Sequence, residues 1–199
     1  MLSRVAIGGG FVLLILFFGD LALGHYDQQH RNAVFQQQMA AQPAPVVPLP
    51  DRIQPYPLDG VDFALRVPKL AYFAAVGEGT DAAALNAGPG HYPDTAWPGQ
   101  PDNVGVAAHN VYWIAFDRLQ PGDEVRLETR WGTYTYRITT RRVVAADDRS
   151  ILVHTLGPRL TLTTCWPLWA GQFATQRLVF LADQVNPAPT KAPPQQNPA

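Results

Sequence analysis

The chain has one cysteine, Cys165, which ends the segment Thr-Leu-Thr-Thr-Cys over residues 161–165. If this segment is a β-strand, Thr161, Thr163 and Cys165 share one face, because successive side chains of a strand point to opposite sides. A cysteine that only fills a core would more naturally have aliphatic neighbours on its face, yet free cysteine is among the most buried residue types. The thiol is therefore either core filling or a reactive group.

Two other residues could act together with this thiol. His109 ends the apolar run over 104–108, and Arg177 opens the apolar run over 178–182. Taken alone, each fits a structural residue at the end of a strand. Cysteine acyl chemistry needs a base near the thiol, a proton donor for a leaving amine and a positive or hydrogen-bonding group for the oxyanion. The cysteine, the histidine and the arginine supply these parts, each at a predicted strand end.

In this arrangement the sequence resembles the sortase family. The family's Thr-Leu-x-Thr-Cys pattern is met at 161–165, its histidine by His109, and its arginine, about a dozen residues after the cysteine, by Arg177. A Phe-x-x-Leu-x-x-Gly-Asp segment follows the histidine at 116–123, and the resemblance covers about residues 65–182. The proline after the cysteine and the short loop to the arginine look most like class D or class E.

The resemblance implies a membrane-anchored cysteine transpeptidase that uses no metal or cofactor. Such an enzyme cuts a Leu-Pro-x-Thr-Gly-like C-terminal sorting signal of a surface protein or pilin and joins the new carboxyl end to an amine of the cell wall or a pilin. By this resemblance Cys165 forms a thioester with the threonine carbonyl, and His109 passes protons to and from the amines. Arg177 would position the signal and stabilise the oxyanion. Thr164 would line the substrate-binding site through its hydroxyl or its backbone, and Asn110 stands where relatives often carry arginine.

From the residues alone, two other interpretations stay open. Another envelope cysteine acyl-transfer enzyme, such as a papain-like hydrolase or an L,D-transpeptidase, would act on peptidoglycan without a sorting signal. A non-enzymatic β-domain displayed on a membrane stalk would keep its thiol away from His109 and Arg177. A nucleic-acid partner is disfavoured, since 15 basic residues balance 16 acidic ones. The single cysteine excludes an internal disulfide and a multi-cysteine metal site.

Short apolar or alternating runs predict the strands that must position these residues. Within 133–143, for example, aromatic and apolar residues alternate with polar ones, which is the period of a strand. The segments expected to be strands are 61–67, 70–76, 103–109, 123–129, 133–143, 160–165 and 177–182. Helical patterns are limited to 80–87 and 113–119. Many short strands with few helices favour an all-β barrel or sandwich, and the family resemblance narrows this to a closed eight-stranded β-barrel with one or two short helices.

Composition divides the chain into four parts. The expected parts are a membrane anchor or signal peptide over 1–24, a polar and proline-rich stalk over 25–57, the catalytic domain over 58–185 and a proline-rich disordered tail over 186–199. The apolar segment 5–24 just reaches the roughly 20 residues that a transmembrane helix needs, while its small residues near 22–24 also suit signal-peptide cleavage. Residues 25–42 could form a helix or stay disordered. Whether residues 1–24 are a membrane anchor or a signal peptide, the catalytic domain is expected outside the cytoplasm. If they are an anchor, the chain is a single-pass protein of the cell membrane.

Overall fold

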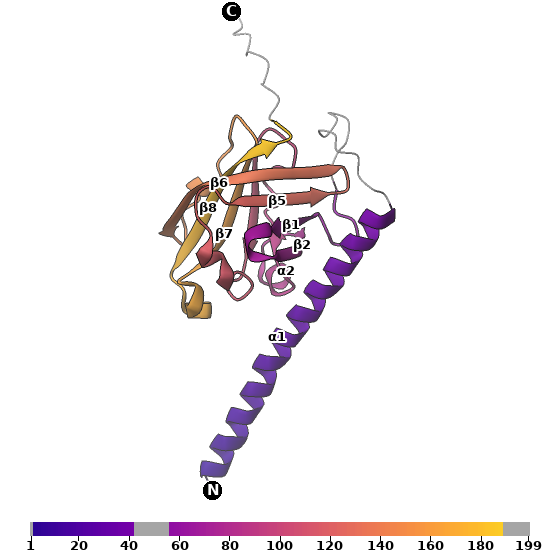
Figure 1. The fold of residues 1–199 in the computed structure, drawn as a ribbon. Coiled ribbons are helices and arrows are strands. Elements are labelled where there is room, and N and C mark those ends of the chain that lie inside the picture. The colour runs from indigo at the N-terminus through magenta and orange to yellow at the C-terminus, as the bar shows by residue number, and fades with distance from the viewer. Residues whose placement is uncertain (1, 42–55, 189–199) are drawn as a thin grey trace, which may run out of the picture.

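A closed β-barrel forms the body of the protein in the computed structural model, which describes residues 2–41 and 56–188 (Figure 1). Eight strands close the barrel in the order β1-β2-β3-β4-β7-β8-β6-β5. Their bounds are β1 Phe63–Val67, β2 Tyr72–Glu78, β3 Gly90–His91, β4 Asn103–Ala108, β5 Glu124–Thr129, β6 Gly132–Ala145, β7 Arg159–Trp166 and β8 Gln176–Asn186. The expectation of a closed eight-stranded barrel is confirmed.

Strand pairing decides which residues meet at the ends of the barrel. β4 runs parallel to β7, as β2 does to β3, and the other pairs are antiparallel. Ala108 at the end of β4 lies opposite Thr164 of β7, so the next residues, His109 and Cys165, follow at the same level. On the other side of β7, Cys165 lies opposite Arg177 of β8. Three segments far apart in the sequence are thereby brought to neighbouring strand ends.

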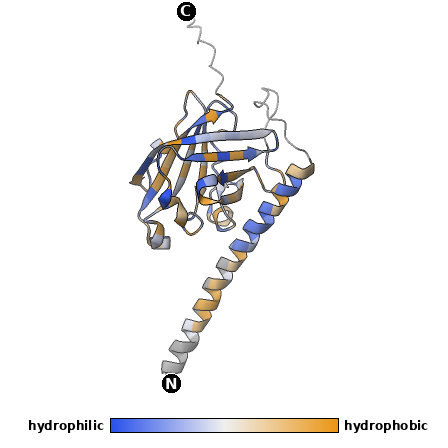
Figure 2. Ribbon diagram, viewed as in Figure 1, coloured by the Kyte–Doolittle hydropathy of each residue, from blue (hydrophilic) through white to orange (hydrophobic). Residues whose placement is uncertain are grey.

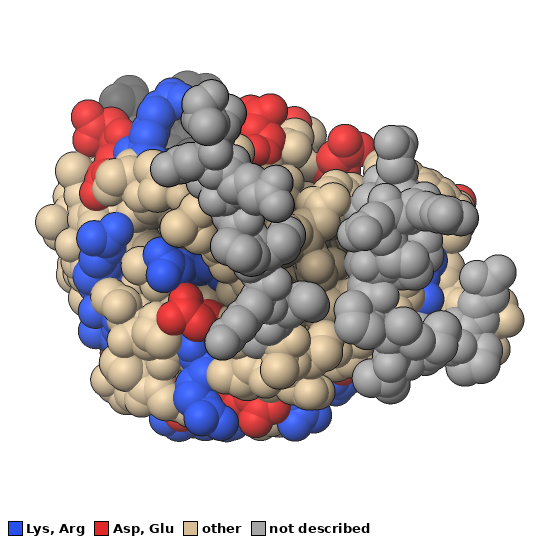
Figure 3. Space-filling model, turned by 90° about the horizontal axis from the view of Figure 1, so that it is seen from above, with Lys and Arg blue, Asp and Glu red and all other residues tan. Residues whose placement is uncertain are grey.

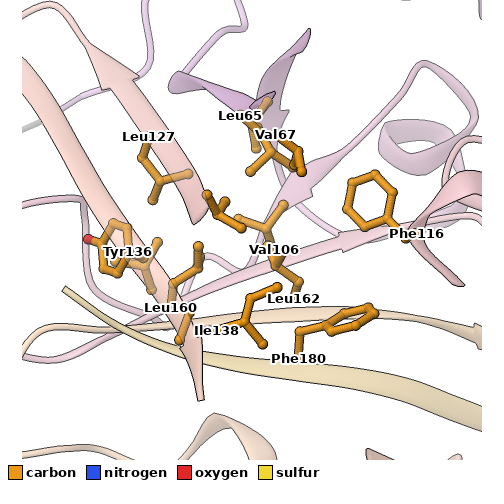
Figure 4. Close-up of a cluster of buried hydrophobic side chains, with 14 of the residues drawn as sticks. Leu65, Val67, Val106, Phe116, Leu127, Tyr136, Ile138, Leu160, Leu162 and Phe180 are labelled. Atoms are coloured by element: carbon orange, nitrogen blue, oxygen red, sulfur yellow. The ribbon is translucent and has the colours of Figure 1, made fainter. Parts of the chain in front are cut away.

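The inner faces of the strands fill the barrel with apolar side chains. In β6, Tyr134, Tyr136 and Ile138 are buried while the residues between them are more exposed, as the alternating sequence predicts. Burying each side chain of this size contributes about 1.5–3 kcal/mol. Figure 4 shows part of this core, with labelled side chains Leu65, Val67, Val106, Phe116, Leu127, Tyr136, Ile138, Leu160, Leu162 and Phe180.

Short helices connect the strands. The α-helix α2, Ala82–Asn86, lies within the predicted 80–87 and is capped by Asp81, whose carboxylate accepts a 3.0 Å hydrogen bond from the Ala84 N–H. Within the described residues, the 3₁₀ helices are η1 Pro68–Leu70, η2 Ile114–Arg118, η3 Ser150–Leu152 and η4 Leu168–Phe173. Pro167 begins the turn into η4 directly after β7, so this strand ends just after its cysteine, as expected.

A long N-terminal helix, α1 Leu2–Ala41, runs along the outside of the barrel (Figure 1). Of the two alternatives for residues 25–42, the structure shows a helix over 25–41, and this part packs on β2. Only Gly77 and Glu78 of β2 pair with β3, so Ala75 has a free outer edge. The Ala75 N–H donates to Asn32 Oδ1 at 2.7 Å, and Gln28 Nε2 donates to the Ala75 carbonyl at 3.1 Å.

The same helix changes character along its length. Figure 2 shows its hydrophilic part beside the barrel and its hydrophobic part projecting past the barrel. The exposed apolar side chains of this part are Phe11, Val12, Leu14, Ile15, Leu16, Phe18 and Leu23. Among the residues described, no helix combines the length and the apolar character needed to cross a membrane. Residues 42–55 of the expected stalk and 189–199 of the expected tail lie outside the described residues.

On the face of the protein that Figure 3 shows, charged side chains of both signs are mixed. Lys and Arg are interspersed with Asp and Glu on the face seen from above in Figure 3, in keeping with the near balance of 15 basic and 16 acidic residues.

Candidate active site

Cys165 and Arg177 face each other at the junction of β7 and β8. Both side chains are half-buried, and Arg177 Nη1 lies 3.9 Å from Cys165 Sγ. The Arg177 Nε–H donates to the Ala146 carbonyl at 2.9 Å, which fixes the plane of the guanidinium beside the sulfur. A fixed positive charge at this distance stabilises a thiolate and can also stabilise negative charge that develops on a bound carbonyl oxygen.

His109 follows β4 on the other side of β7. It comes one residue after the Ala108–Thr164 pair, at the level of Cys165. Its side chain is half-buried, and burial lowers its pKa below the ordinary value of 6.5. Its Nε2 lies 3.2 Å from Asn86 Oδ1 at the end of α2. The imidazole and the thiol thus lie at neighbouring strand ends, and within the described chain no direct hydrogen bond joins them.

Thr164 lies on a different face from the one that carries the thiol. It pairs with Ala108, a residue of the barrel core, and its side chain is 1% exposed. The Thr164 hydroxyl is buried without a hydrogen-bond partner. Because strand side chains alternate, this hydroxyl points into the barrel, and only the backbone of Thr164 borders the region around Cys165. The expectation that its hydroxyl lines the site does not fit this orientation.

The threonines that do share a face with Cys165 hold the surrounding loops. The Thr161 hydroxyl donates to Asn103 Oδ1 at 2.8 Å and also contacts the Ile151 carbonyl in η3. The Thr163 hydroxyl lies 3.1 Å from the hydroxyl of Tyr92, in the segment between β3 and β4. These bonds keep two connecting segments against the outer face of β7, next to the thiol.

The segments that leave β4 and β7 are also tied together. Asn110, the residue after the histidine, is 5% exposed, and its Nδ2 donates to the Gly171 carbonyl of η4 at 3.1 Å. On the other side of the thiol, the Arg141 guanidinium lies over the Trp166 ring at 5.6 Å and donates to Asp117 Oδ1 at 2.6 Å. Asn110 therefore joins the two loops that flank the site, a role for which arginine is not required.

A second histidine, His91, forms a buried pair inside the protein. His91 in β3 and Asp62 are 2% and 0% exposed, and His91 Nδ1 lies 2.9 Å from Asp62 Oδ2. His91 Nε2 faces the Ala96 carbonyl at 3.0 Å, so this nitrogen carries a proton. β3 has only two residues, which is too short for a periodic pattern to reveal it.

Metal binding has no visible basis in this part of the chain. In residues 2–41 and 56–188, no group of three or more His, Cys, Asp or Glu side chains could hold a metal ion. The chemistry supported by the side chains around the thiol is proton transfer and electrostatic stabilisation.

Fold and site together define a class: a closed β-barrel that presents a thiol, a guanidinium and an imidazole at three neighbouring strand ends. The comparisons with known proteins agree. The family model of the sortase domain matches residues 65–185. Sortase D of Bacillus subtilis (strain 168) is 32% identical over 123 residues, which are 61% of this chain and 62% of that protein's length.

Solved structures show the same fold. A Clostridium perfringens sortase D5 transpeptidase superposes with a TM-score of 0.62 at 20% identity, covering 82% of this chain and 99% of that one. Sortase E1 from Streptomyces coelicolor, solved with a tripeptide in its active site, gives a TM-score of 0.56 at 26% identity and covers 63% of this chain and 88% of that one. The chain belongs to the sortase family.

Proposed function

We propose that the protein is a sortase-type cysteine transpeptidase in which Cys165 is the nucleophile, His109 the acid and base, and Arg177 the oxyanion-stabilising and substrate-positioning group. The single observation that carries this proposal is the 3.9 Å approach of Arg177 Nη1 to Cys165 Sγ, next to the strand end that presents His109. Membership of the sortase family, whose members are cysteine transpeptidases, adds the type of reaction.

In the first half of the reaction, the Cys165 thiolate attacks the carbonyl carbon of the threonine in the sorting signal. The oxygen takes up the negative charge and is stabilised by the Arg177 guanidinium. When the tetrahedral intermediate collapses, the carbon–nitrogen bond breaks and the departing amine takes a proton from the His109 imidazolium. A thioester on Cys165 and a neutral imidazole remain.

In the second half, an acceptor amine attacks the thioester and loses a proton to His109. Because the thioester is an activated acyl group, one difficult amide exchange is divided into two easier steps. The carbon–sulfur bond breaks, a new amide forms and the thiolate is restored. Burial of His109 keeps the neutral imidazole accessible at neutral pH, which suits the base of this half-reaction.

The proposed substrate is a surface protein or pilin with a Leu-Pro-x-Thr-Gly-like C-terminal signal, and the proposed acceptor is an amine of a cell-wall precursor or a pilin. The likeness to sortase D and sortase E1 supports a peptide substrate. The backbone of Thr164 borders this substrate-binding region.

We also propose that the N-terminal part of α1 attaches the protein to the cell membrane, with the barrel on the extracytoplasmic side. Support comes from the exposed apolar side chains that project past the barrel, among them Phe11, Ile15 and Phe18 (Figure 2). Cleavage after Gly24 would cut a helix whose next turns pack on β2, so an uncleaved anchor fits better than a signal peptide. The four-part division at 24, 57 and 185 stands as a proposal, with 25–41 as a docked helix.

The test uses the full chain in detergent, a library of sorting-signal peptides and an amine acceptor. Cys165→Ala, His109→Ala and Arg177→Ala should each lower transpeptidation by several orders of magnitude, the usual effect of deleting one member of a cooperating catalytic set. The matched controls are His154→Ala, whose side chain is 90% exposed, and Arg159→Ala, an arginine of β7 at the opposite end of the β7–β8 pair from Arg177.

Mass spectrometry should detect a thioester adduct that hydroxylamine releases from the wild type and that Cys165→Ala does not form. Undiminished cleavage by Cys165→Ala would refute the mechanism. Turnover of muropeptides without any sorting signal would instead indicate an L,D-transpeptidase or a peptidoglycan hydrolase.

A further inference from the structure

The seam between α1 and the barrel ends next to the proposed catalytic histidine. Along this seam, Gln28 and Asn32 bond both backbone groups of Ala75, and Phe35 is 1% exposed within an apolar cluster between the helix and β1 and β2. Gln38 Nε2 donates to the Leu58 carbonyl at 3.1 Å at the far end. Residues 28–38 of α1 are therefore docked on the barrel by specific side-chain contacts.

At its other end, the seam reaches the segment that follows α2. Gly24 is buried, and a Cβ atom at this position would lie 2.5 Å from the Asn86 carbonyl oxygen and 2.6 Å from the Tyr112 hydroxyl oxygen. One turn further along α1, Gln28 packs so closely on Gly88 that a Cβ there would overlap its Oε1. Only glycine allows the helix and this segment to approach so closely.

Asn86 lies between α1 and His109 and contacts the surroundings of both. The Tyr112 hydroxyl donates to its backbone carbonyl. Burial raises the pKa of Tyr112, and the Asp27 carboxylate of α1 raises it further, so the hydroxyl keeps the proton that it donates. The side chain of Asn86 points the other way, with Oδ1 3.2 Å from His109 Nε2. In the described chain this is the one hydrogen bond of the His109 ring.

We propose that Asn86 is a positioning residue for His109, and that α1, through Gly24 and Gln28, holds Asn86 in place. In this arrangement the His109 Nε2–H donates to Asn86 Oδ1, which leaves Nδ1 as the nitrogen that exchanges protons with the amines. α1 is then part of the support of the active site, in addition to linking the barrel to the N-terminal apolar segment. This inference rests on the proposed role of His109.

The first experiment examines the ring directly. In the full chain with ¹⁵N-labelled histidine, the His109 resonances are assigned by comparison with His109→Gln. The wild type should show a single neutral tautomer with the proton on Nε2, and Asn86→Ala should give a mixture of tautomers. Asn86→Asp, which places a carboxylate at hydrogen-bond distance, should raise the pKa of His109 by about one pH unit. An unchanged tautomer in Asn86→Ala, together with an unchanged pKa in Asn86→Asp, would overturn the proposal.

The second experiment asks whether α1 acts through Asn86. Gly24→Ala and Gly19→Ala both add one methyl group to α1 and raise its helix propensity by a similar amount, but Gly19 has no atom within 4 Å of the added Cβ. Gly24→Ala should lower kcat by roughly 10- to 100-fold with little change in KM, the scale expected when a catalytic group is displaced by about 1 Å. Gly19→Ala should behave as the wild type.

Combining the substitutions completes the test. Asn86→Ala should lower kcat by a similar factor, and adding Gly24→Ala to it should cause little further loss, because both act on the same contact. Equal activity of Gly24→Ala and Gly19→Ala, with equal thermal stability, would overturn the part assigned to α1. If the wild type cleaves no sorting peptide while the tautomer of His109 still depends on Asn86, the proposed function fails and the positioning contact stands.

Discussion

Breaking the buried pair of His91 and Asp62 should destabilise the barrel strongly. The two side chains are 2% and 0% exposed, and His91 Nδ1 lies 2.9 Å from Asp62 Oδ2. The other carboxylate oxygen, Oδ1, is buried without a hydrogen-bond partner. His91 thus provides the side-chain contact of an otherwise costly buried carboxylate.

His91→Phe is the informative perturbation, because an aromatic ring is retained. The ring packs edge-on against Phe63 and Trp97, at 5.2 and 5.1 Å between centroids, and phenylalanine can keep both contacts. What is lost is the partner of Asp62, and removing one partner of a buried pair costs about 3–5 kcal/mol. For a protein of this size, that corresponds to a fall in Tm of about 6–20 °C.

Urea denaturation of the full chain in detergent, followed by tryptophan fluorescence, measures this loss. Combining His91→Phe with Asp62→Leu should recover most of the stability, since apolar replacement of both partners leaves no buried charge. A loss below about 1 kcal/mol for His91→Phe, or a double variant as unstable as the sum of the single ones, would refute the reasoning.

Three other substitutions have defined outcomes. Phe35→Ala should lower the free energy of unfolding by about 3–5 kcal/mol because the ring is 1% exposed. Phe11→Ala, at a ring that is 67% exposed, should change the free energy of unfolding by less than about 0.5 kcal/mol. Equal urea midpoints of these two variants would contradict this. Burial lowers the pKa of His109 below 6.5, so the unfolded chain binds the proton first as the pH falls. Stability is therefore lost as the pH falls from above 6.5 through the pKa of the folded state. His109→Gln should flatten this part of the stability curve in calorimetry, and an unaltered curve would show that the ring is solvated. Arg177→Lys keeps the charge but cannot contact Cys165 Sγ and the Ala146 carbonyl in the same geometry. Acyl-enzyme formation, followed by rapid-quench mass spectrometry, should therefore slow by about 100-fold. The control variant Arg159→Lys should not show this effect.

The strands around the site were predictable because their patterns are local. β6 alternates apolar and polar residues, β7 ends where Pro167 cannot continue the ladder, and the apolar runs of β4 and β8 end or begin at a polar residue. Sequence reasoning could therefore place Cys165, His109 and Arg177 at strand ends. Their register, with Cys165 opposite Arg177, depends on the closed topology of the barrel. This topology was expected only from the family resemblance.

Contacts that depend on the folded surface were not predictable. Asn86 is an ordinary polar residue at the end of a short helix, and only the fold brings it to His109. The docked part of α1 was missed as a packing element because its seam uses polar side chains, Gln28 and Asn32, on backbone groups of β2. The apolar contacts of this part are confined to the cluster around Phe35, so the seam produces no extended apolar stripe at helical spacing, which is the signal that predicts a buried helix face.

The polar seam on Ala75 also bears on self-association. An uncovered strand edge offers unpaired N–H and C=O groups to any other chain that can add a strand, and β2 has such an edge because it pairs with β3 only at Gly77 and Glu78. Asn32 and Gln28 satisfy the two backbone groups of Ala75 in place of a neighbouring strand. In a barrel that begins at residue 58 this strand edge would be uncovered, and we expect edge-to-edge pairing between copies. By covering the edge, α1 would protect the barrel from aggregation.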